Sequence, residues 1–537
     1  MTSSSHRRVV RALVCALALI ASLLFASPAS ARSGPSAATW EACGDAGARC
    51  ATIAAPLDYD RPRGDTLDVH VARVPAADRA NRIGTLFLNF GGPGAPMAVY
   101  LEAFGRDLFP ALSERYDLVG VDPRGTGETE GAIDCEVNQE TTGIYATPFF
   151  TPLNLDVEAL LSRARTYVTT CLRRIDTRLV AHFSTANSAR DMDTVRRALR
   201  EDRLNYLGFS YGTVLGATYA TLFPRGYNRM VLDGPVDVTR YFNAPEQNLR
   251  EQTAGFERAL GRFFQACAAD QEACSGFGGR DPWKAFDRLI DRADEAPLPA
   301  PNSSDPRPVD GDDIIAAAFT ELYSQFAWGE LAYALAQADA GDGSAIRDLA
   351  NQFWGRDDEG RYDPLSDRYF ILGAIEQRFR RSLQDALRQG DESWGEFEHF
   401  FVNFGYLHVN YVLWPIRDRD AFYGPFRLPA RANTPLVAAT TYDPATPFNG
   451  ARRLVRELGN ARLLKVRADG HTVYGQANSP CADAAIETYL LTGVLPAPGT
   501  VCEGELAFER FEPTPVTQTV GAEGVPALSA RLARPLP

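Results

Sequence analysis

Short apolar runs alternate with helix-like segments on either side of a long helical stretch, and this alternation limits the possible folds more than any other feature. Strand-like runs occur at 67–74, 84–94, 116–127, 229–235, 434–443 and 461–471. Most are compact and continuously apolar, which is typical of strands that are buried on both faces of a sheet. Strands that alternate with helices in this way predict an α/β fold with a mostly parallel sheet.

The pattern changes between residues 238 and 430, where helical periodicity replaces the strand signals. A long example is 312–338, and a proline-rich linker occupies 295–308. We therefore predict a large, mainly helical cap at 238–430, inserted before the last core strands. The core would comprise 32–237 and 431–510, and the tail at 511–537 is expected to be loosely ordered. The aromatic cluster at 394–415 fits either core packing or a wall that faces the substrate.

The N-terminus, residues 1–31, has the features of an export signal. Three arginines precede an apolar run at 12–26, and small residues at 29–31 form an A-x-A site. The run is about 15 residues long, shorter than the roughly 20 that a membrane-spanning helix needs. We expect cleavage, no membrane anchor afterwards, and a secreted or periplasmic protein. The formal net charge of −13 argues against nucleic acid as a partner.

Eight cysteines remain after the export signal. An even number in an exported chain predicts disulfides, although eight cysteines allow 105 pairings. Their close spacing favours sequential pairs, namely Cys43–Cys50, Cys135–Cys171, Cys267–Cys274 and Cys481–Cys502. The chain has no C-x-x-C, and no cysteine pair lies near a histidine pair, so we expect no metal site.

Residues 208–212, Gly-Phe-Ser-Tyr-Gly, fit the pattern G-x-S-x-G between an apolar run at 204–207 and a helix-like run at 213–223. On its own the pattern also fits an ordinary serine in a glycine-rich loop. In the right context it places Ser210 on a sharp turn from strand to helix, where its hydroxyl is exposed for attack. A serine nucleophile also needs a base, a carboxylate that orients the base, and donors for the oxyanion.

The base is expected well after Ser210, because one recurring order along the chain is serine, acid, histidine. The chain has six histidines, and three of them precede the serine. His399 and His408 fall in the helical stretch. His471 follows the last strong strand signal, in the loop DGHTVYG. We therefore predict His471 as the general base.

The acid is expected after a strand that lies between the serine and His471. Asp443 ends the run PLVAATTY and enters a proline turn, so it is the preferred acid. Asp233, in VLDGP, is the alternative. Asp469 is too close to His471 in sequence to be favoured.

Two backbone N–H groups would complete the site as an oxyanion hole. One belongs to Tyr211, the residue after the serine. The other is expected in the loop NFGGPGAP, where glycine permits a close approach of backbone to substrate. Pro93 has no N–H, which leaves Gly92 as the predicted donor. An ordinary turn is the alternative, whereas a phosphate loop lacks its motif here.

These motifs carry a wider resemblance. The motifs are CATIAAPLDYDRP, NFGGPGAP, VDPRGTG, YLGFSYGTVLGATYATLFP, MVLDGPVD, YDPATP, GHTVYG and YLLTGVLPAPGTVC. Together they resemble those of the secreted tripeptidyl-aminopeptidase-like branch of the proline-iminopeptidase family of serine exopeptidases. The resemblance covers about residues 40–502. It implies the α/β-hydrolase fold, with the nucleophile at Ser210, the acid at Asp443, the base at His471 and the glycine loop at 91–94. It also implies the same four cysteine pairs.

The sequence departs from the family pattern at several positions. Phe90 stands where a histidine often precedes the glycine loop, and Glu128 stands where a serine often closes the DPRGTG turn. A cysteine pair that is usual in the cap is absent, with Gln377 and Tyr411 near the expected places. The cap sets substrate choice in this family, so these departures affect specificity more than chemistry.

The resemblance implies a secreted serine exopeptidase that releases short peptides or amino acids from free N-termini and needs no cofactor. In this family acidic cap residues bind the substrate amine, and Glu246, Glu321 and Glu330 are candidates. An esterase or amidase that acts on small non-peptide substrates is the first alternative, since the same triad serves all acyl transfers. A non-catalytic secreted binding protein is the second.

Overall fold

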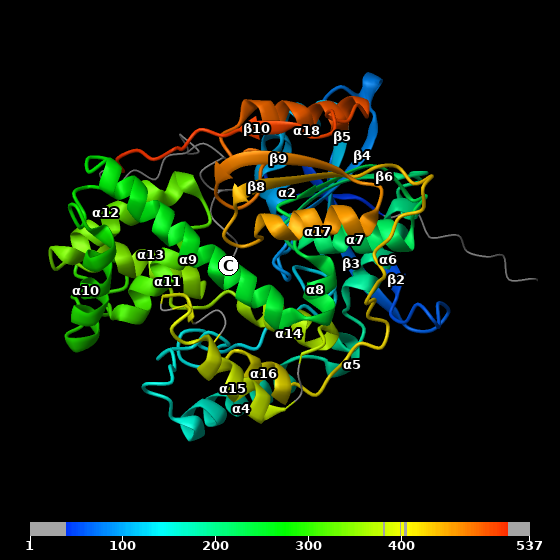
Figure 1. The fold of residues 1–537 in the computed structure, drawn as a ribbon. Helices are drawn as coiled ribbons and strands as arrows, with labels where there is room; N and C mark the ends of the chain where they lie inside the picture. Colours follow the sequence, from blue (N-terminus) through cyan, green and yellow to red (C-terminus); the bar gives the residue numbers. More distant parts are fainter. Residues whose placement is uncertain (1–38, 380–381, 398, 402–404, 514–537) are drawn as a thin grey trace, which may run out of the picture. The chain divides into compact units, whose positions relative to one another are not determined.

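A computed structural model describes residues 39–379, 382–397, 399–401 and 405–513 (Figure 1). The predicted export signal and nearly all of the predicted tail lie outside these residues. The described chain from Trp40 onward forms one compact unit. The division of this unit into a core and a cap at 238–430 therefore stays a prediction. No helix in the described ranges is both long enough and apolar enough to cross a bilayer.

A ten-stranded sheet in the order β1-β2-β3-β5-β4-β6-β7-β8-β9-β10 forms the centre. Neighbours from β5 to β10 pair in parallel, whereas β1, β2 and β3 join antiparallel to one another and to β5. This arrangement confirms the predicted α/β fold. The strands are β1 (Glu41–Cys43), β2 (Ala48–Pro56), β3 (Thr66–Val74), β4 (Gly84–Asn89), β5 (Tyr116–Val121), β6 (Leu204–Phe209), β7 (Tyr227–Asp233), β8 (Leu436–Tyr442), β9 (Arg462–Asp469) and β10 (Val501–Glu503).

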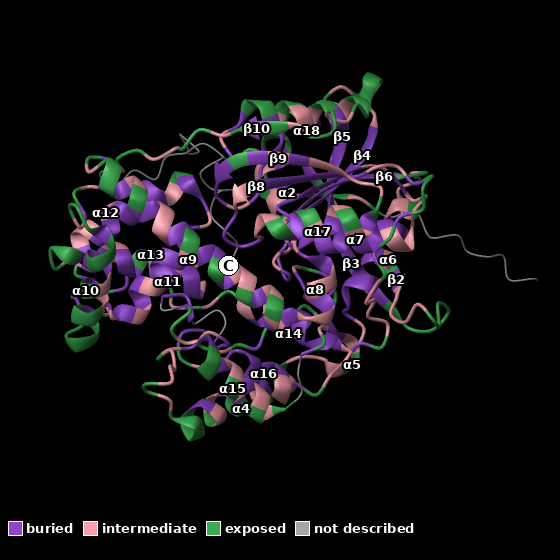
Figure 2. Cartoon of the chain, in the orientation of Figure 1, coloured by how far each residue is buried: buried purple, intermediate pink, exposed green. Residues whose placement is uncertain are grey.

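Helices cover both faces of the sheet, which explains why the central strands are apolar throughout. Every residue of β4, β5 and β6 is buried (Figure 2). Figure 1 shows α18 on one side of the strands and α7 and α17 on the other. The helices outside 238–430 are α2 (Ala98–Phe104), α3 (Pro110–Ser113), α4 (Val157–Arg174), α5 (Thr177–Val180), α6 (Thr185–Ala198), α7 (Gly212–Leu222), α17 (Phe448–Leu458) and α18 (Pro480–Thr492).

Between β7 and β8 the described chain consists of helices and loops, and its β-structure is limited to two isolated bridges, Leu298–Val309 and Arg356–Tyr362. The long run at 312–338 is split into α11 and α12 by a 3-10 turn at Gln325–Ala327, and the Ser324 hydroxyl caps this turn. The helices are α8 (Val238–Asn243), α9 (Pro245–Ala269), α10 (Pro282–Glu295), α11 (Gly311–Glu321), α12 (Trp328–Asp339), α13 (Ser344–Trp354), α14 (Leu365–Glu376), α15 (Leu383–Ser393) and α16 (His408–Leu413).

The aromatic cluster at 394–415 contributes mainly to packing. Phe400 belongs to the largest buried cluster, and Phe401 and Tyr406 belong to a smaller one. Tyr411 packs on Phe379, with ring centroids 4.0 Å apart. Tyr411 and Gln377 both lie against Gly373, so side-chain packing occupies the place of the missing cysteine pair.

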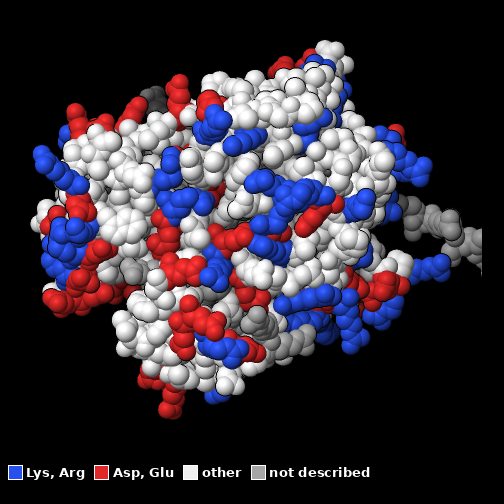
Figure 3. All heavy atoms as spheres, in the orientation of Figure 1, with Lys and Arg blue, Asp and Glu red and all other residues white. Residues whose placement is uncertain are grey.

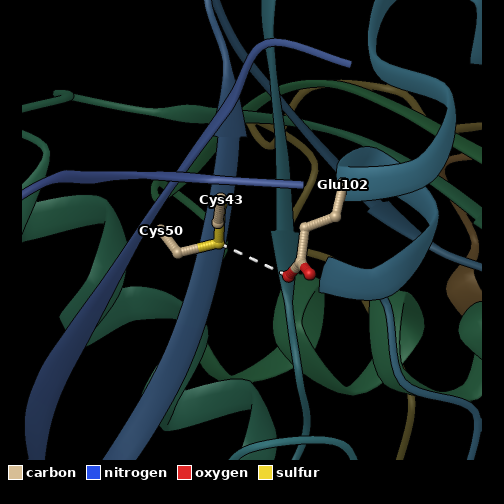
Figure 4. Close-up of side chains that lie close together, drawn as sticks. All are labelled: Cys43, Cys50 and Glu102. Carbon is tan, nitrogen blue, oxygen red and sulfur yellow. Dashed lines mark hydrogen bonds between the residues drawn. A yellow bond between two sulfur atoms is a disulfide. The ribbon is translucent and has the colours of Figure 1, made fainter. Parts of the chain in front are cut away.

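Four disulfides join the cysteines in the sequential pairs that their spacing predicted. Two groups of potential ligands come close together in the described chain, and each consists of a disulfide plus one carboxylate. Figure 4 shows one of them, in which Glu102 points toward the bond between Cys43 and Cys50. Its Oε1 lies 3.4 Å from Cys50 Sγ. A sulfur in a disulfide is not a thiolate, so neither group offers the ligand set of a zinc site.

Candidate active site

Ser210 occupies a tight turn between β6 and α7. Its φ of +54° is uncommon for a residue other than glycine and marks a strained backbone. Its N–H donates to the carbonyl oxygen of Asp233 at the end of β7 (2.9 Å). A Cβ on Gly212 would lie 2.6 Å from the carbonyl oxygen of Asn89, and one on Gly208 would lie 2.7 Å from the Gly212 carbonyl oxygen. Both glycines of the motif are therefore required by close backbone contacts.

The carboxyl ends of neighbouring parallel strands bring the predicted site residues to one edge of the sheet. The glycine loop follows β4, Ser210 follows β6, Asp443 follows β8 and His471 follows β9. This edge is where open α/β sheets bind their ligands.

Asp443 and His471 form a hydrogen-bonded pair. The Nδ1 atom of His471 lies 2.9 Å from Asp443 Oδ1 and 3.0 Å from Oδ2. Because Nδ1 faces the carboxylate, it is the nitrogen that carries the proton of a neutral imidazole, and Nε2 is left as the acceptor. His471 Nε2 is buried and has no hydrogen-bond partner in the described chain, which suits a base that awaits a hydroxyl proton.

The Asp443 carboxylate is fully buried but well compensated. It accepts the N–H groups of Ala445 (2.9 Å), Thr446 (2.7 Å) and Thr472 (3.2 Å), and the Thr446 hydroxyl donates to Oδ2 (2.9 Å). Hydrogen bonds of this kind stabilise the ionised form. Thr446 Oγ1 also lies 3.2 Å from His471 Nδ1. Thr446 therefore contacts both members of the pair.

Asp233, the alternative acid, contacts the histidine loop through its backbone and not through the imidazole. Its carboxylate accepts the N–H groups of Val473 (2.7 Å) and Tyr474 (2.8 Å). Burial raises the pKa of Asp233 to about 7, against the opposing effect of these two donors. The contacts anchor the loop that carries His471 next to the strand end that supports Ser210.

The glycine loop lies directly against the serine turn. A Cβ on Gly91 would lie 2.8 Å from the Phe209 carbonyl oxygen and 2.9 Å from the Tyr211 nitrogen. The N–H groups of Gly92 and Tyr211, the predicted oxyanion donors, donate to no other protein group in the described ranges. Phe90 packs behind the turn, with its ring centroid 5.6 Å from that of Phe209 and 5.0 Å from that of Tyr100.

A pocket that opens to solvent lies between these elements and the helices of 238–430. Its floor includes Gly92, Ser210, Tyr211 and Thr446. Other parts of the lining come from Asp237, Tyr241, Asn248, Glu251, Gln252 and Tyr369.

The three acids predicted to bind a substrate amine do not line this cavity. Glu321 is buried at the end of α11, and Glu246 and Glu330 are half-buried in the first turns of α9 and α12. The acids that do line the cavity are Glu251, in α9, and Asp237, just before α8.

Thr446 and Glu251 are functional candidates that the sequence did not identify, and Asp233 makes contacts that the sequence did not predict. Thr446 stands inside the motif YDPATP, three residues after the acid, where a hydroxyl can return to the carboxylate. The sequence suggests Asp233 only as a rival acid, although its place at a strand end also predicts an anchoring role. Glu251 carries no such signal, because the exposed face of a long helix cannot be identified without its neighbours.

The fold and this edge of the sheet define the class, a serine hydrolase with the α/β-hydrolase fold. A family model described as alpha/beta hydrolase fold matches residues 85–275, and one described as TAP-like protein matches residues 412–502. Serine protease Hip1 of Mycobacterium tuberculosis is 31% identical over 469 residues, which cover 85% of this chain and 87% of that protein. The chain belongs to the TAP-like α/β-hydrolases.

Two further relatives have different names. Carboxylesterase B of Mycobacterium tuberculosis is 30% identical over 473 residues, covering 85% of this chain and 86% of that protein. Tripeptidyl aminopeptidase of Streptomyces lividans is 29% identical over 513 residues, covering 89% of this chain and 88% of that protein. The relatives of this chain thus include proteins named as peptidases and a protein named as an esterase.

Proposed function

We propose that this serine hydrolase is an exopeptidase that releases short peptides or amino acids from free N-termini through an acyl-enzyme. The observation that carries the proposal is the cavity, which has Ser210 in its floor and acidic and amide side chains of α9 in its wall. Relatives named serine protease and tripeptidyl aminopeptidase support the same chemistry.

In the proposed reaction the Ser210 hydroxyl attacks the scissile carbonyl while His471 Nε2 takes its proton. Asp443 holds Nδ1 and stabilises the imidazolium that forms. The N–H groups of Tyr211 and Gly92 stabilise the oxyanion. The imidazolium then gives its proton to the leaving amine, and the C–N bond breaks. Water, activated by the same histidine, hydrolyses the ester and regenerates Ser210.

The substrate amine would meet Glu251 and its neighbours Asn248 and Gln252 on α9. Glu251 is already paired with Arg240 and Arg453, and both arginines also pair with Asp237. Opposite charges balance within this cluster, so an ammonium group would gain most from the amide oxygens and from the cavity-facing edge of Glu251. Glu246, Glu321 and Glu330 remain predictions for the same role.

A panel of single-residue, dipeptidyl and tripeptidyl anilides, each with a free or an acetylated N-terminus, tests the proposal. We expect cleavage of the free-amine compounds, with the preferred length defining the subtype, and loss of cleavage in Ser210→Ala. Equal cleavage of acetylated anilides would overturn the exopeptidase assignment. Inactivity of the folded wild-type protein across the panel would favour a binding protein.

An esterase is the second candidate, because one relative has the name carboxylesterase B. The same serine, histidine and aspartate would serve, and only the leaving group would differ. Short-chain p-nitrophenyl esters distinguish the two. An esterase would hydrolyse them far faster than any free-amine anilide, whereas an exopeptidase would depend on the free amine.

We also propose that the protein acts outside the cytoplasm on peptide substrates and not on nucleic acid. The four disulfides support an oxidising compartment. The net charge of −13 and the mixture of acidic and basic groups on the face shown in Figure 3 support small-molecule or peptide partners. Fractionation of the source cells, with the N-terminus of the mature protein sequenced, tests this assignment.

A further inference from the structure

Glu376, the last residue of α14, contacts the first turn of α6. The side chain is 1% exposed. Its Oε2 accepts the Thr185 N–H (2.8 Å), and its Oε1 accepts the Thr185 hydroxyl (2.7 Å) and the Tyr241 hydroxyl (3.2 Å). The three donors favour the ionised form of this carboxyl group, whereas its burial opposes that form.

These contacts lead to the serine turn. Thr185 Oγ1 lies 2.5 Å from the Tyr211 hydroxyl. Because Thr185 has one hydroxyl proton and an ionised Glu376 can only accept, that proton goes to Glu376. The Tyr211 hydroxyl must then donate to Thr185 Oγ1. The result is a directed chain from Tyr211 through Thr185 to Glu376.

The same helix also braces the other predicted oxyanion element. A Cβ on Gly94 would lie 2.5 Å from the Arg368 Cβ atom and 3.3 Å from the Leu365 side chain, so the start of α14 packs on the glycine loop. Tyr369 lies in the cavity wall, and Glu376 ends the helix at the Tyr211 chain. Helix α14 therefore packs on the glycine loop directly and reaches Tyr211 through Thr185.

We propose that Glu376 is a positioning residue, which fixes the Tyr211 side chain through Thr185 and thereby aims the Tyr211 N–H at the substrate carbonyl. This role rests on the proposed function of Ser210 and Tyr211. Glu376 does not line the cavity, so it acts through Tyr211 and not on the substrate.

Protonation of Glu376 would remove the fixed direction of the chain, because a neutral carboxyl group can donate to the hydroxyl of Thr185 or of Tyr241 as well as accept from it. Burial raises the pKa of Glu376 to about 8. The groups that face it are Tyr211, Tyr241 and Asp418, and burial raises the pKa of each. The directed chain should therefore form as pH rises through about 8.

Glu376→Gln and Thr185→Val test the proposal on the mature protein with a free-amine anilide. We expect kcat to fall about 10-fold above pH 8 with KM near the wild-type value, a smaller loss than deletion of an oxyanion donor causes. We also expect the wild-type rise of kcat near pH 8 to be absent in both variants. If Glu376→Gln does not fold, Thr185→Val gives the same readout.

Asp418→Asn is the matched control. Asp418 is buried, and it accepts the N–H of Ser184 (2.7 Å), the residue before Thr185, without a contact to Tyr211. It should lower stability and move the kcat rise to lower pH without abolishing it, because the Asp418 charge helps to raise the pKa of Glu376. Wild-type kcat and pH profile in both test variants would overturn the positioning role, as would an equal kcat loss in the control. Activity that survives in Ser210→Ala would instead overturn the proposed function.

Discussion

Two aspartates at neighbouring strand ends, Asp443 and Asp233, have different partners. We therefore expect their replacement to have different effects on activity and stability. Asp443 contacts the imidazole of His471, whereas Asp233 contacts only backbone N–H groups of the loop behind it. The first contact stabilises the imidazolium of the proposed reaction. The second positions the loop.

Asp443→Asn should lower kcat by about 10⁴-fold, because an amide no longer holds the required tautomer or stabilises the imidazolium. Asp233→Asn should cost about 1–3 kcal/mol of stability, since its amide would face a backbone donor. Its kcat loss should be much smaller. Anilide kinetics and urea unfolding of both variants test this assignment, and the larger kcat loss in Asp233→Asn would contradict it.

At the scale of elements, Arg124 joins the DPRGTG turn to β2 and α6. It is fully buried, and it donates to both carboxylate oxygens of Asp191 (2.6 and 2.8 Å). Its remaining N–H groups donate to the carbonyl oxygens of Pro56, Leu57 and His182. All five guanidinium donors are thus used.

Asp191→Asn should destabilise the protein by about 3–5 kcal/mol, because it leaves a buried cation without its counter-ion. Arg124→Lys should also be destabilising, since an ammonium has three donors for five acceptor contacts. Asp357→Asn is the control, because its partner Arg361 is exposed and such pairs contribute about 0–1 kcal/mol. Equal urea midpoints for the buried and exposed variants would contradict the prediction.

The sequence predicted those elements whose residues carry a strong local signal. The apolar runs at 67–74 and 229–235 became β3 and β7, and the order of serine, acid and histidine led to residues that the structure places at one sheet edge. It did not predict β2, whose small alanines give a weak alternation. The acids of the cavity could not be identified, because the packing of α9 decides which side of that helix faces the substrate.

At the scale of the whole molecule, the disulfides close loops of very different length. Cys135–Cys171 spans 36 residues, Cys481–Cys502 spans 21, and the other two span 7 each. A crosslink stabilises mainly by limiting the unfolded chain, and this effect grows with loop length.

Replacing Cys135 and Cys171 together by serine should therefore cost about 4 kcal/mol, against about 2 kcal/mol for Cys43 and Cys50. Thermal unfolding of the two double variants at one pH gives the comparison. A larger loss of stability for the short loop would contradict the entropic account, and it would indicate that the Cys43–Cys50 bond acts mainly on the folded state.

Buried carboxyl groups also give the whole molecule a pH-dependent stability. Burial raises the pKa of Asp233 to about 7 and that of Glu376 to about 8, both well above their values in an unfolded chain. Between pH 5 and 7 the folded state therefore holds protons that the unfolded state has released. The stabilisation is complete below the unfolded pKa and is lost as pH rises through the folded pKa.

We expect the free energy of unfolding to fall from pH 5 to 7 by up to about 1.4 kcal/mol per pH unit for each group. Urea unfolding followed by tryptophan fluorescence measures this slope, and Asp233→Asn and Glu376→Gln should each reduce it. Asp305→Asn is the control. Burial raises the pKa of Asp305, but its hydrogen bonds with Arg307 and Asn351 outweigh this effect and lower the pKa. The contribution of Asp305 to stability is therefore lost only in acid. An unchanged slope in both test variants would mean that these two carboxyl groups are ionised in the folded protein throughout that range.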